Sequence, residues 1–211
     1  IGGRAALLYT LNNKNNIYLS LSNGFKAGGI NQNPTLSETN QIYDPENNIN
    51  IDCGWRYTDQ KATLNINAFY MYRNNIQLSL SSQLENGNPS SFYFYTANVE
   101  RGTNSGLDFF LNYRLTTKTN IFLNYGLLET TKDSFTYPSP ILDTNILIEE
   151  RDQARAPKYT IATGIESQLS TKLFARLELI AKDRYYYFNN TDQMSKSYTI
   201  LNFISKYKIN K

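Results

Sequence analysis

A strict alternation of apolar and polar residues recurs along this chain, and it constrains the fold more than any other feature. In one segment Leu64, Ile66 and Ala68 alternate with Asn65 and Asn67. A period of two places the apolar side chains on one face of a β-strand, whereas a helix would repeat them every three or four residues. The pattern predicts strands at about nine places, which are 4–11, 17–27, 48–57, 62–79, 94–114, 119–132, 157–168, 172–186 and 197–208.

The connections between these strands are of two kinds, and the two kinds alternate. Consecutive antiparallel strands would therefore meet in tight hairpins at one end of a sheet and in long loops at the other. Short periplasmic turns and long outer loops are the arrangement of an outer-membrane β-barrel. The short polar turns fall at 12–16, 58–61, 116–119 and 169–172, and the long polar loops fall at 29–47, 80–92, 134–153 and 189–196.

A soluble β-sandwich also has strands with one apolar face, and three features favour the membrane barrel over it. Runs such as 62–79 exceed the roughly 3–10 residues usual for strands of globular proteins. The face opposite the apolar stripe carries Asn, Ser, Arg and Glu, as a wet lumen would. Aromatic residues gather near strand ends, with Trp55 and Tyr57 beside a turn and 185–187 beside a loop, where barrels have interfacial girdles.

The barrel interpretation also predicts the direction of individual side chains. A slip of one residue in register would reverse every assignment in a strand, so the prediction is strict. Because only every second residue meets lipid, a barrel tolerates the 27 Asn residues and the mean hydropathy of −0.50. The side chains expected to point outward are Leu64, Ile66, Leu107, Leu111, Leu123 and Leu177, and those expected to point inward are Asn65, Asn67, Asp108, Asn124 and Glu178.

The composition excludes most catalytic and metal-binding chemistry. The chain has 211 residues, no His and one Cys. Without an imidazole there is no Ser/His or Cys/His pair, and a lone thiol builds no disulfide, zinc or iron–sulfur framework. The net charge of +3 provides no basic face for nucleic acid. We therefore expect no enzyme activity, no cofactor and no nucleic-acid partner, and we expect Cys53, on the apolar stripe with Ile51 and Trp55, to be an inert lipid-facing thiol.

Short motifs resemble those of TonB-dependent outer-membrane receptors, in order and over nearly the whole chain. The closest subset is the siderophore receptors of the pesticin and yersiniabactin type. The resemblance rests on IYLSLSNGFKAGGIN at 17–31, YDPE at 43–46, NIDCGWR at 50–56, AFYMYRNNIQ at 68–77, AN at 97–98 with SGLD at 105–108, and APKY at 156–159.

The resemblance implies a fold and a function. The chain would be all-β, an antiparallel transmembrane β-barrel segment with about nine long strands of a barrel of ~22 strands, with short periplasmic turns and long extracellular loops. Residues 1–211 would form part of the barrel domain, without the plug domain and the last strands. The function implied is import of a ferric siderophore through the bacterial cell outer membrane. The partners would be that ligand, outer-membrane lipid and, through the plug, the TonB complex, and the barrel would be monomeric.

Two other functions stay open at this point. One is a non-transporting outer-membrane β-barrel or surface binding protein, and the other is a TonB-dependent importer of another ligand such as cobalamin or an oligosaccharide. Siderophore complexes are often anionic or catechol-like, so cationic and phenolic side chains in outer positions are the candidate ligand contacts. An aromatic girdle is the alternative role for each tyrosine among them. The candidates are Lys26, Arg73, Tyr93, Tyr95, Arg101, Arg151, Tyr185 and Tyr187.

Other polar and glycine motifs are expected to be structural. Arg176, Glu178 and Lys182 alternate on one strand, which predicts an ion-pair ladder facing the lumen. The glycines at 24–29 lack the Gly-Lys-Ser/Thr order of a phosphate loop, and we expect a bend at a strand end there. Gly106 is expected at a bulge or a position of close packing.

Overall fold

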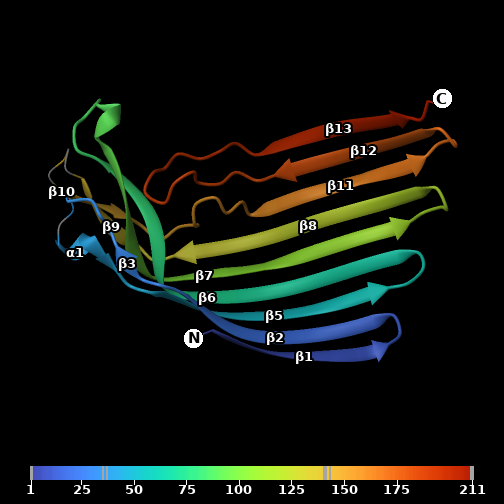
Figure 1. The fold of residues 1–211 in the computed structure, drawn as a ribbon, viewed down its shortest axis with the longest axis horizontal. Coiled ribbons are helices and arrows are strands. Elements are labelled where there is room, and N and C mark those ends of the chain that lie inside the picture. The colour runs from blue at the N-terminus through green and yellow to red at the C-terminus, as the bar shows by residue number, and fades with distance from the viewer. Residues whose placement is uncertain (1, 35, 37, 140–141, 143, 210–211) are drawn as a thin grey trace.

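The structure is a computed structural model that describes residues 2–34, 36, 38–139, 142 and 144–209, and one nine-stranded antiparallel sheet dominates it (Figure 1). Each long strand pairs with the next long strand of the chain, which confirms the predicted all-β fold. Among the described residues the sheet is open, with β1 and β13 at its edges. The strands are β1 (Gly3–Asn12), β2 (Asn15–Lys26), β5 (Glu46–Thr58), β6 (Ala62–Gln83), β7 (Phe92–Arg114), β8 (Thr119–Lys132), β11 (Tyr159–Gln168), β12 (Leu173–Lys182) and β13 (Tyr198–Tyr207).

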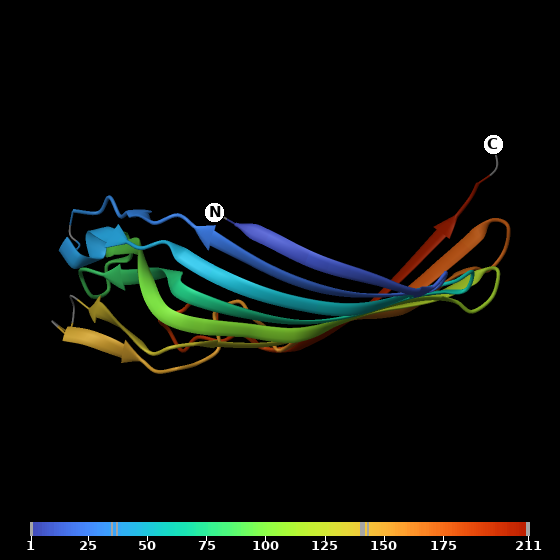
Figure 2. The ribbon, with the colours of Figure 1, turned by 90° about the horizontal axis from the view of Figure 1, so that it is seen from below.

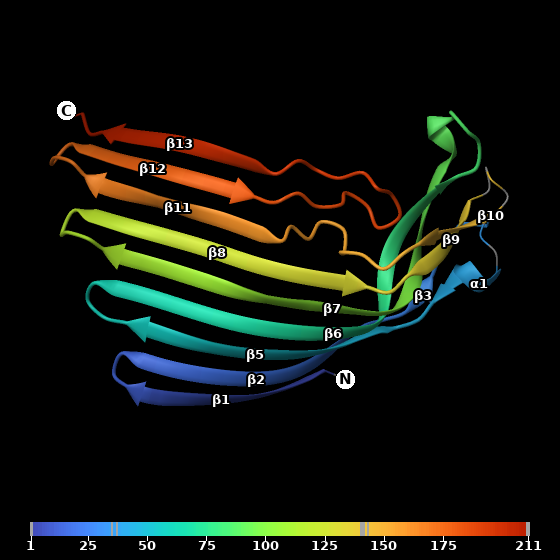
Figure 3. The same ribbon diagram turned by 180° about the vertical axis from the view of Figure 1, so that it is seen from behind.

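Tight turns and long connections lie at opposite ends of the sheet, as the sequence predicts (Figures 1 and 3). At the loop end the connections have structure of their own, which the alternation did not reveal. The additional elements are the strand pair β3 (Gly29–Ile30) and β4 (Ile42–Tyr43), the helix α1 (Glu38–Gln41), the short helix η1 (Pro89–Ser91), and the strand pair β9 (Phe135–Ser139) and β10 (Thr144–Ile148). No helix among the described residues is long and apolar enough to span a membrane.

The turn between β5 and β6 shows how local chemistry sets the short connections. Asp59 Oδ1 accepts hydrogen bonds from the backbone amides of Lys61 and Ala62, each at 2.8 Å. The Tyr57 hydroxyl donates to Asp59 Oδ2 at 2.7 Å. These bonds favour the charged carboxylate, and they lower the pKa of Asp59 to about 2, with the Tyr57 bond as the largest cause. An aspartate that binds the backbone two residues ahead is a common device for closing a turn.

Two predicted strand boundaries are wrong by several residues. Part of the loop expected at 80–92 is strand, because β6 runs to Gln83 and β7 begins at Phe92, which leaves 84–91 as the connection. The strand expected at 172–186 ends at Lys182 instead. Beyond that point the backbone of Tyr185 bonds with the returning loop, where the Ser195 amide donates to its carbonyl at 2.9 Å, and it no longer pairs with a neighbouring strand of the sheet.

The register places the two predicted sets of side chains on opposite faces of one curved sheet (Figure 2). Asn65, Asn67, Asp108 and Asn124 line a hollow of about 400 Å³ on the concave face. The predicted outward set lies on the other face, where Leu107 and Leu177 are exposed and the other four side chains are half-buried. Cys53 is also exposed on this face. No second sheet covers this apolar face among the described residues, so the sandwich alternative is wrong.

Candidate functional site

The inner, concave face pairs aromatic rings with glycines on the neighbouring strand. A Cβ atom added at Gly106 would lie 2.7 Å from Phe69 Cζ, and one added at Gly164 would lie 2.8 Å from Phe122 Cζ. The rings therefore lie directly over these glycines, as predicted for Gly106. Such close packing explains why glycine is retained in strand interiors, where it is otherwise unfavourable. The three cross-strand pairs are Tyr18 with Gly54, Phe69 with Gly106, and Phe122 with Gly164.

The predicted ladder of charges on this face is confirmed for two of its three members. Arg176 lies 2.5 Å from Glu178 and 3.4 Å from Glu166 on β11, a partner that the sequence did not identify. The Arg176 guanidinium also stacks on the Phe122 ring at 4.3 Å. Lys182 stands apart from the ladder, because its ammonium lies over the Tyr185 ring at 4.4 Å.

At the loop end the hairpin of β6 and β7 turns across the direction of the sheet (Figures 1 and 3). Asn75 lies at the turning point and has a φ of 52°, a conformation that asparagine tolerates better than most residues. The register continues on both sides of it, from Asn74–Arg101 to Ile76–Val99. The far part of the hairpin leans toward the concave side of the sheet (Figure 2).

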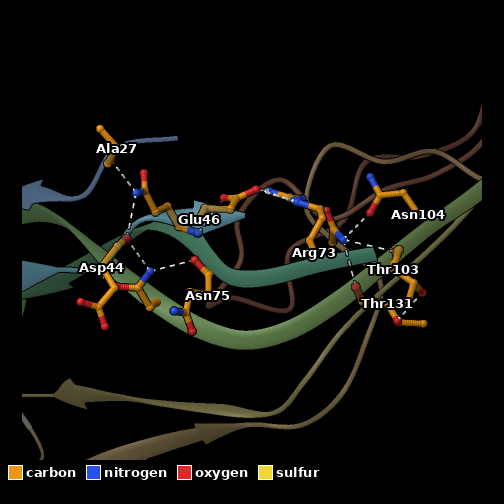
Figure 4. A network of polar contacts seen from close by, with 11 residues as sticks. Ala27, Asp44, Glu46, Arg73, Asn75, Thr103, Asn104 and Thr131 are labelled. Carbon is orange, nitrogen blue, oxygen red and sulfur yellow. Dashed lines mark hydrogen bonds and ion pairs between the residues drawn. The ribbon is translucent and has the colours of Figure 1, made fainter. Parts of the chain in front are cut away.

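A network of polar side chains joins the strands at this bend (Figure 4). The Glu46 carboxylate is buried and accepts hydrogen bonds from Arg73 Nε at 2.8 Å and from the Gln77 amide at 2.9 Å. Arg73 Nη1 donates to Gln153 Oε1 at 2.7 Å. Gln153 Nε2 then donates to Asn104 Oδ1 at 2.7 Å. The network thus connects β5, β6, β7 and the loop between β8 and β11.

The same bend is tied to the connection between β2 and β5. Gln77 Nε2 donates to the carbonyl oxygens of Ala27 at 2.8 Å and Asp44 at 3.0 Å. Asn98 Oδ1 accepts from the Asp44 amide at 2.7 Å, and Asn98 Nδ2 donates to the Asn75 carbonyl at 2.8 Å. Backbone groups that leave the sheet are therefore satisfied by side chains, which holds the bend in one geometry.

An apolar cluster packs against the far part of the hairpin. The rings of Tyr93 and Tyr95 stack inside it with centroids 5.9 Å apart. The Tyr95 hydroxyl is buried without a hydrogen-bond partner among the described residues, and burial raises the pKa of Tyr95. Both tyrosines, predicted as ligand contacts, are thus enclosed in a small core at the loop end. The cluster consists of Leu36, Ile76, Leu78, Leu80, Tyr93, Tyr95, Val99, Phe135 and Ile148.

Lys132, at the end of β8, is a buried cation that the sequence analysis missed. Its side chain is fully enclosed, and its ammonium has no hydrogen-bond partner among the described residues. The ammonium lies 4.8 Å from the centroid of the Phe135 ring. Burial, and secondly the charge of Arg151, lower the pKa of Lys132 to about 8. A lysine that follows an alternating strand carries no local signal of such burial.

We expect Lys132→Met to stabilise the loop end near neutral pH, because the apolar side chain needs no desolvation of a charge. Between pH 8 and ~10.5, Lys132 of the wild type keeps its proton in the unfolded state and has lost it in the folded state. The free energy of unfolding of the wild type should therefore rise with pH over this range. The gain from the substitution should approach about 3 kcal/mol at pH 7. Limited proteolysis checks this when wild-type and variant cleavage rates are compared at each pH. A constant ratio of the two rates from pH 7 to pH 10 would contradict the prediction.

Arg151 is the most firmly held of the other predicted ligand contacts. Its guanidinium binds Asp192 at 2.6 Å and donates to the carbonyl oxygens of Asn189 at 2.8 Å and Thr191 at 3.0 Å. It also stacks on the Tyr186 ring at 4.4 Å. Arg151 therefore anchors the connection between β12 and β13 to the neighbouring loop.

The remaining predicted contacts lie near the loop end without forming one site. Lys26 is exposed at the end of β2, and Arg101 is exposed on β7, where it pairs with Glu100. Tyr185 and Tyr187 pack edge to face with centroids 5.8 Å apart, and Tyr187 is exposed. The structure thus brings together Tyr93 with Tyr95 and Tyr185 with Tyr187, whereas Lys26 and Arg101 stand apart.

Comparison with known proteins identifies a family with this architecture. The family model described as TonB dependent receptor-like, beta-barrel, matches residues 3–211. The chain belongs to the TonB-dependent receptor β-barrel family. The family and the solved structures similar to this receptor barrel are receptors and transporters, not enzymes. No protein with a curated function matches the chain in sequence.

Solved structures share the fold of this TonB-dependent receptor barrel. The ferric yersiniabactin uptake receptor FyuA from Yersinia pestis matches 97% of the chain at 18% identity with a TM-score of 0.73. The siderophore receptor PiuA from Acinetobacter baumannii matches 99% of it at 18% identity with a TM-score of 0.74. The copper transporter OprC matches 100% of it at 11% identity with a TM-score of 0.73. The chain covers only 29%, 29% and 32% of these proteins.

Proposed function

We propose that the chain is part of the wall of an outer-membrane barrel that imports a ferric siderophore. The observation that carries this proposal is the fold shared with two siderophore receptors over 97% and 99% of the chain. The uncovered apolar face and the polar concave face are consistent with lipid outside and a wet lumen inside.

The remainder of the barrel and a plug domain would be supplied by sequence outside residues 1–211 of the receptor. The open edges at β1 and β13 support this part of the proposal, because each edge presents unpaired backbone groups. In such a receptor, a monomeric barrel, the TonB complex would act through the plug, and the ligand would first meet the loop end. A genetic locus that encodes only further hairpins, and no plug, would contradict this arrangement.

Among the predicted ligand contacts, we propose Lys26, Arg101 and Tyr187 as the ones most available to a ligand, because they are exposed at the loop end. Arg73, Tyr93, Tyr95 and Arg151 are engaged in packing and hydrogen bonds within the protein. A ligand contact at these four would require the loop end to rearrange.

Growth under iron limitation tests the proposed function. A strain that lacks the gene should lose growth on at least one ferric siderophore of a panel, and the wild-type gene should restore that growth. Uptake of radioactive iron supplied as that siderophore should fall at least tenfold in the deletion strain. Normal growth on every ferric siderophore, together with a defect under copper limitation, would contradict iron import and favour the activity of the OprC type.

A further inference from the structure

A cleft lies between the bent hairpin and the connection after β12, and its lining combines aromatic rings, hydroxyl groups and a cation, as ligand sites do. It encloses about 300 Å³ and is lined by Ser79, Ser81 and Phe94 from the hairpin, by Tyr187 and Phe188 from the connection, and by Arg155. That volume is at the lower end of the range of ligand pockets, so it suits one ring-bearing part of a ligand.

The aromatic side chains that line this cleft are exposed, and they do not belong to the apolar face of the sheet. Phe94 is 67% exposed and Phe188 is 44% exposed. On β7, the side chain of Phe94 lies on the same face of the strand as Asn104, which is the concave face. The side chains of its neighbours Tyr93 and Tyr95 lie on the opposite face and are packed in the apolar cluster. Neither lipid nor the small core therefore accounts for the exposed ring of Phe94.

The cleft also contains a cation without a partner. The Arg155 side chain is exposed and has no ion-pair or hydrogen-bond partner among the described residues, in contrast to Arg73 and Arg151. The Arg155 backbone has a φ of 60°, which is unfavourable for a residue with a Cβ. Backbone strain of this kind persists only where the surroundings hold it, and it is concentrated at functional sites.

Two connections hold these walls in place. The Arg155 amide donates to the Tyr186 carbonyl at 2.8 Å, and the Ala154 amide donates to Asn189 Oδ1 at 3.3 Å. Asn190 is buried, and its Nδ2 donates to the Ser81 carbonyl on the hairpin at 2.7 Å. The two sides of the cleft are thus linked directly, which makes the site preorganised rather than a chance gap between loops.

From these observations we infer that the cleft binds a planar aromatic group that bears a negatively charged oxygen, as in phenolate, catecholate or aryl carboxylate ligands. Exposed Phe and Tyr rings stack on a flat ring, a guanidinium pairs with the anionic oxygen, and the hydroxyls of Ser79 and Ser81 are available as donors. This inference rests on the proposed function, because it names the class of ferric chelate that such an importer would take. An aliphatic hydroxamate chelate lacks the ring and gains little from these walls.

Calorimetric titration of the receptor, expressed from its complete gene and purified in detergent, tests the inference. The probes are a ferric catecholate chelate and a ferric trihydroxamate chelate. We expect Arg155→Gln, Phe94→Leu and Phe188→Leu each to weaken binding of the catecholate chelate about tenfold, or ~1.4 kcal/mol, with no comparable change for the trihydroxamate. Arg184→Gln is the matched control for Arg155→Gln, because Arg184 is an exposed arginine on the connection after β12 and does not line the cleft. Resistance to unfolding in sodium dodecyl sulfate without heating establishes that each variant is a folded barrel.

The results separate this inference from the proposed function. Catecholate binding that depends on Arg155, in a receptor whose deletion has no effect on iron uptake, would support the cleft and contradict iron import. Iron uptake with unchanged catecholate binding in all three cleft variants would overturn the cleft and leave iron import standing. Equal weakening of both chelates, or no binding of the catecholate by the wild type, would also overturn the cleft.

Discussion

Glu46→Ala is expected to release the bent hairpin of β6 and β7 at a cost of about 3 kcal/mol or more. The substitution removes the carboxylate that binds Arg73 and the Gln77 amide, and it leaves a half-buried guanidinium with Gln153 as its remaining partner at this site. Loss of one member of a buried ion pair is far more costly than loss of an exposed pair, because the remaining charge stays desolvated.

Hydrogen exchange measured by mass spectrometry checks this expectation in peptides from 74–99. Protection there should fall by a factor of about 100 or more, whereas β12 should be unchanged. Glu46→Gln keeps the size and one acceptor, and its effect should be intermediate. Glu100→Ala is the matched control, since Glu100 is exposed and its pair with Arg101 should contribute under about 1 kcal/mol. Equal protection in Glu46→Ala and Glu100→Ala would show that the network does not hold the bend.

Gly106→Ala is expected to be the most damaging single-methyl substitution on the inner wall. The new Cβ would overlap the Leu127 carbonyl oxygen and would lie 2.7 Å from Phe69 Cζ, so the backbone of the sheet has to move. Overpacking of a tight site costs roughly 1–3 kcal/mol, and the overlap with backbone places this substitution at the upper end. The urea midpoint of the receptor in detergent micelles should fall, together with the yield of folded barrel.

Gly126→Ala is the control for this experiment, because Gly126 lies on the same face of the neighbouring strand. Its new Cβ would lie 3.1 Å from Thr160 Oγ1 and 3.5 Å from Asp108 Oδ1, which are ends of side chains that can shift. Its effect should stay within about 1 kcal/mol. Similar midpoints for the two variants would mean that the contact between Phe69 and Gly106 is not a constraint on the sheet.

The strands were predictable because their signal is local. The alternation of Leu64 and Ile66 with Asn65 identifies strand, face and direction within a few residues. The boundary errors arose at the loop end of the sheet. There β6 continues to Gln83 in the bent hairpin, and the residues after Lys182 pair with their own loop.

The candidate site was predictable only in its general position at the loop end. The eight predicted contacts were chosen by side-chain type, and four of them, Arg73, Tyr93, Tyr95 and Arg151, are engaged within the protein. Arg155 and Phe94 were not among the predicted ligand contacts. The unpaired charge of Arg155 and the exposed ring of Phe94 depend on the surrounding structure, and the neighbouring sequence carries no signal of them. Gln153 reaches Arg73 across 80 positions, a separation over which no local pattern extends.

The sequence by itself determined the strands, the two faces, the alternation of turns and loops and, through its ordered motifs, the receptor family. These properties follow from the two-residue period of a strand and from turn chemistry, both of which act over a few neighbouring residues. Only the tertiary structure decided the bend at Asn75, the enclosure of Lys132, the Glu46–Arg73–Gln153 network and the cleft at Arg155. Each of these depends on segments far apart in the chain meeting at one end of the sheet, where burial and hydrogen bonding are set by the neighbours that the fold supplies.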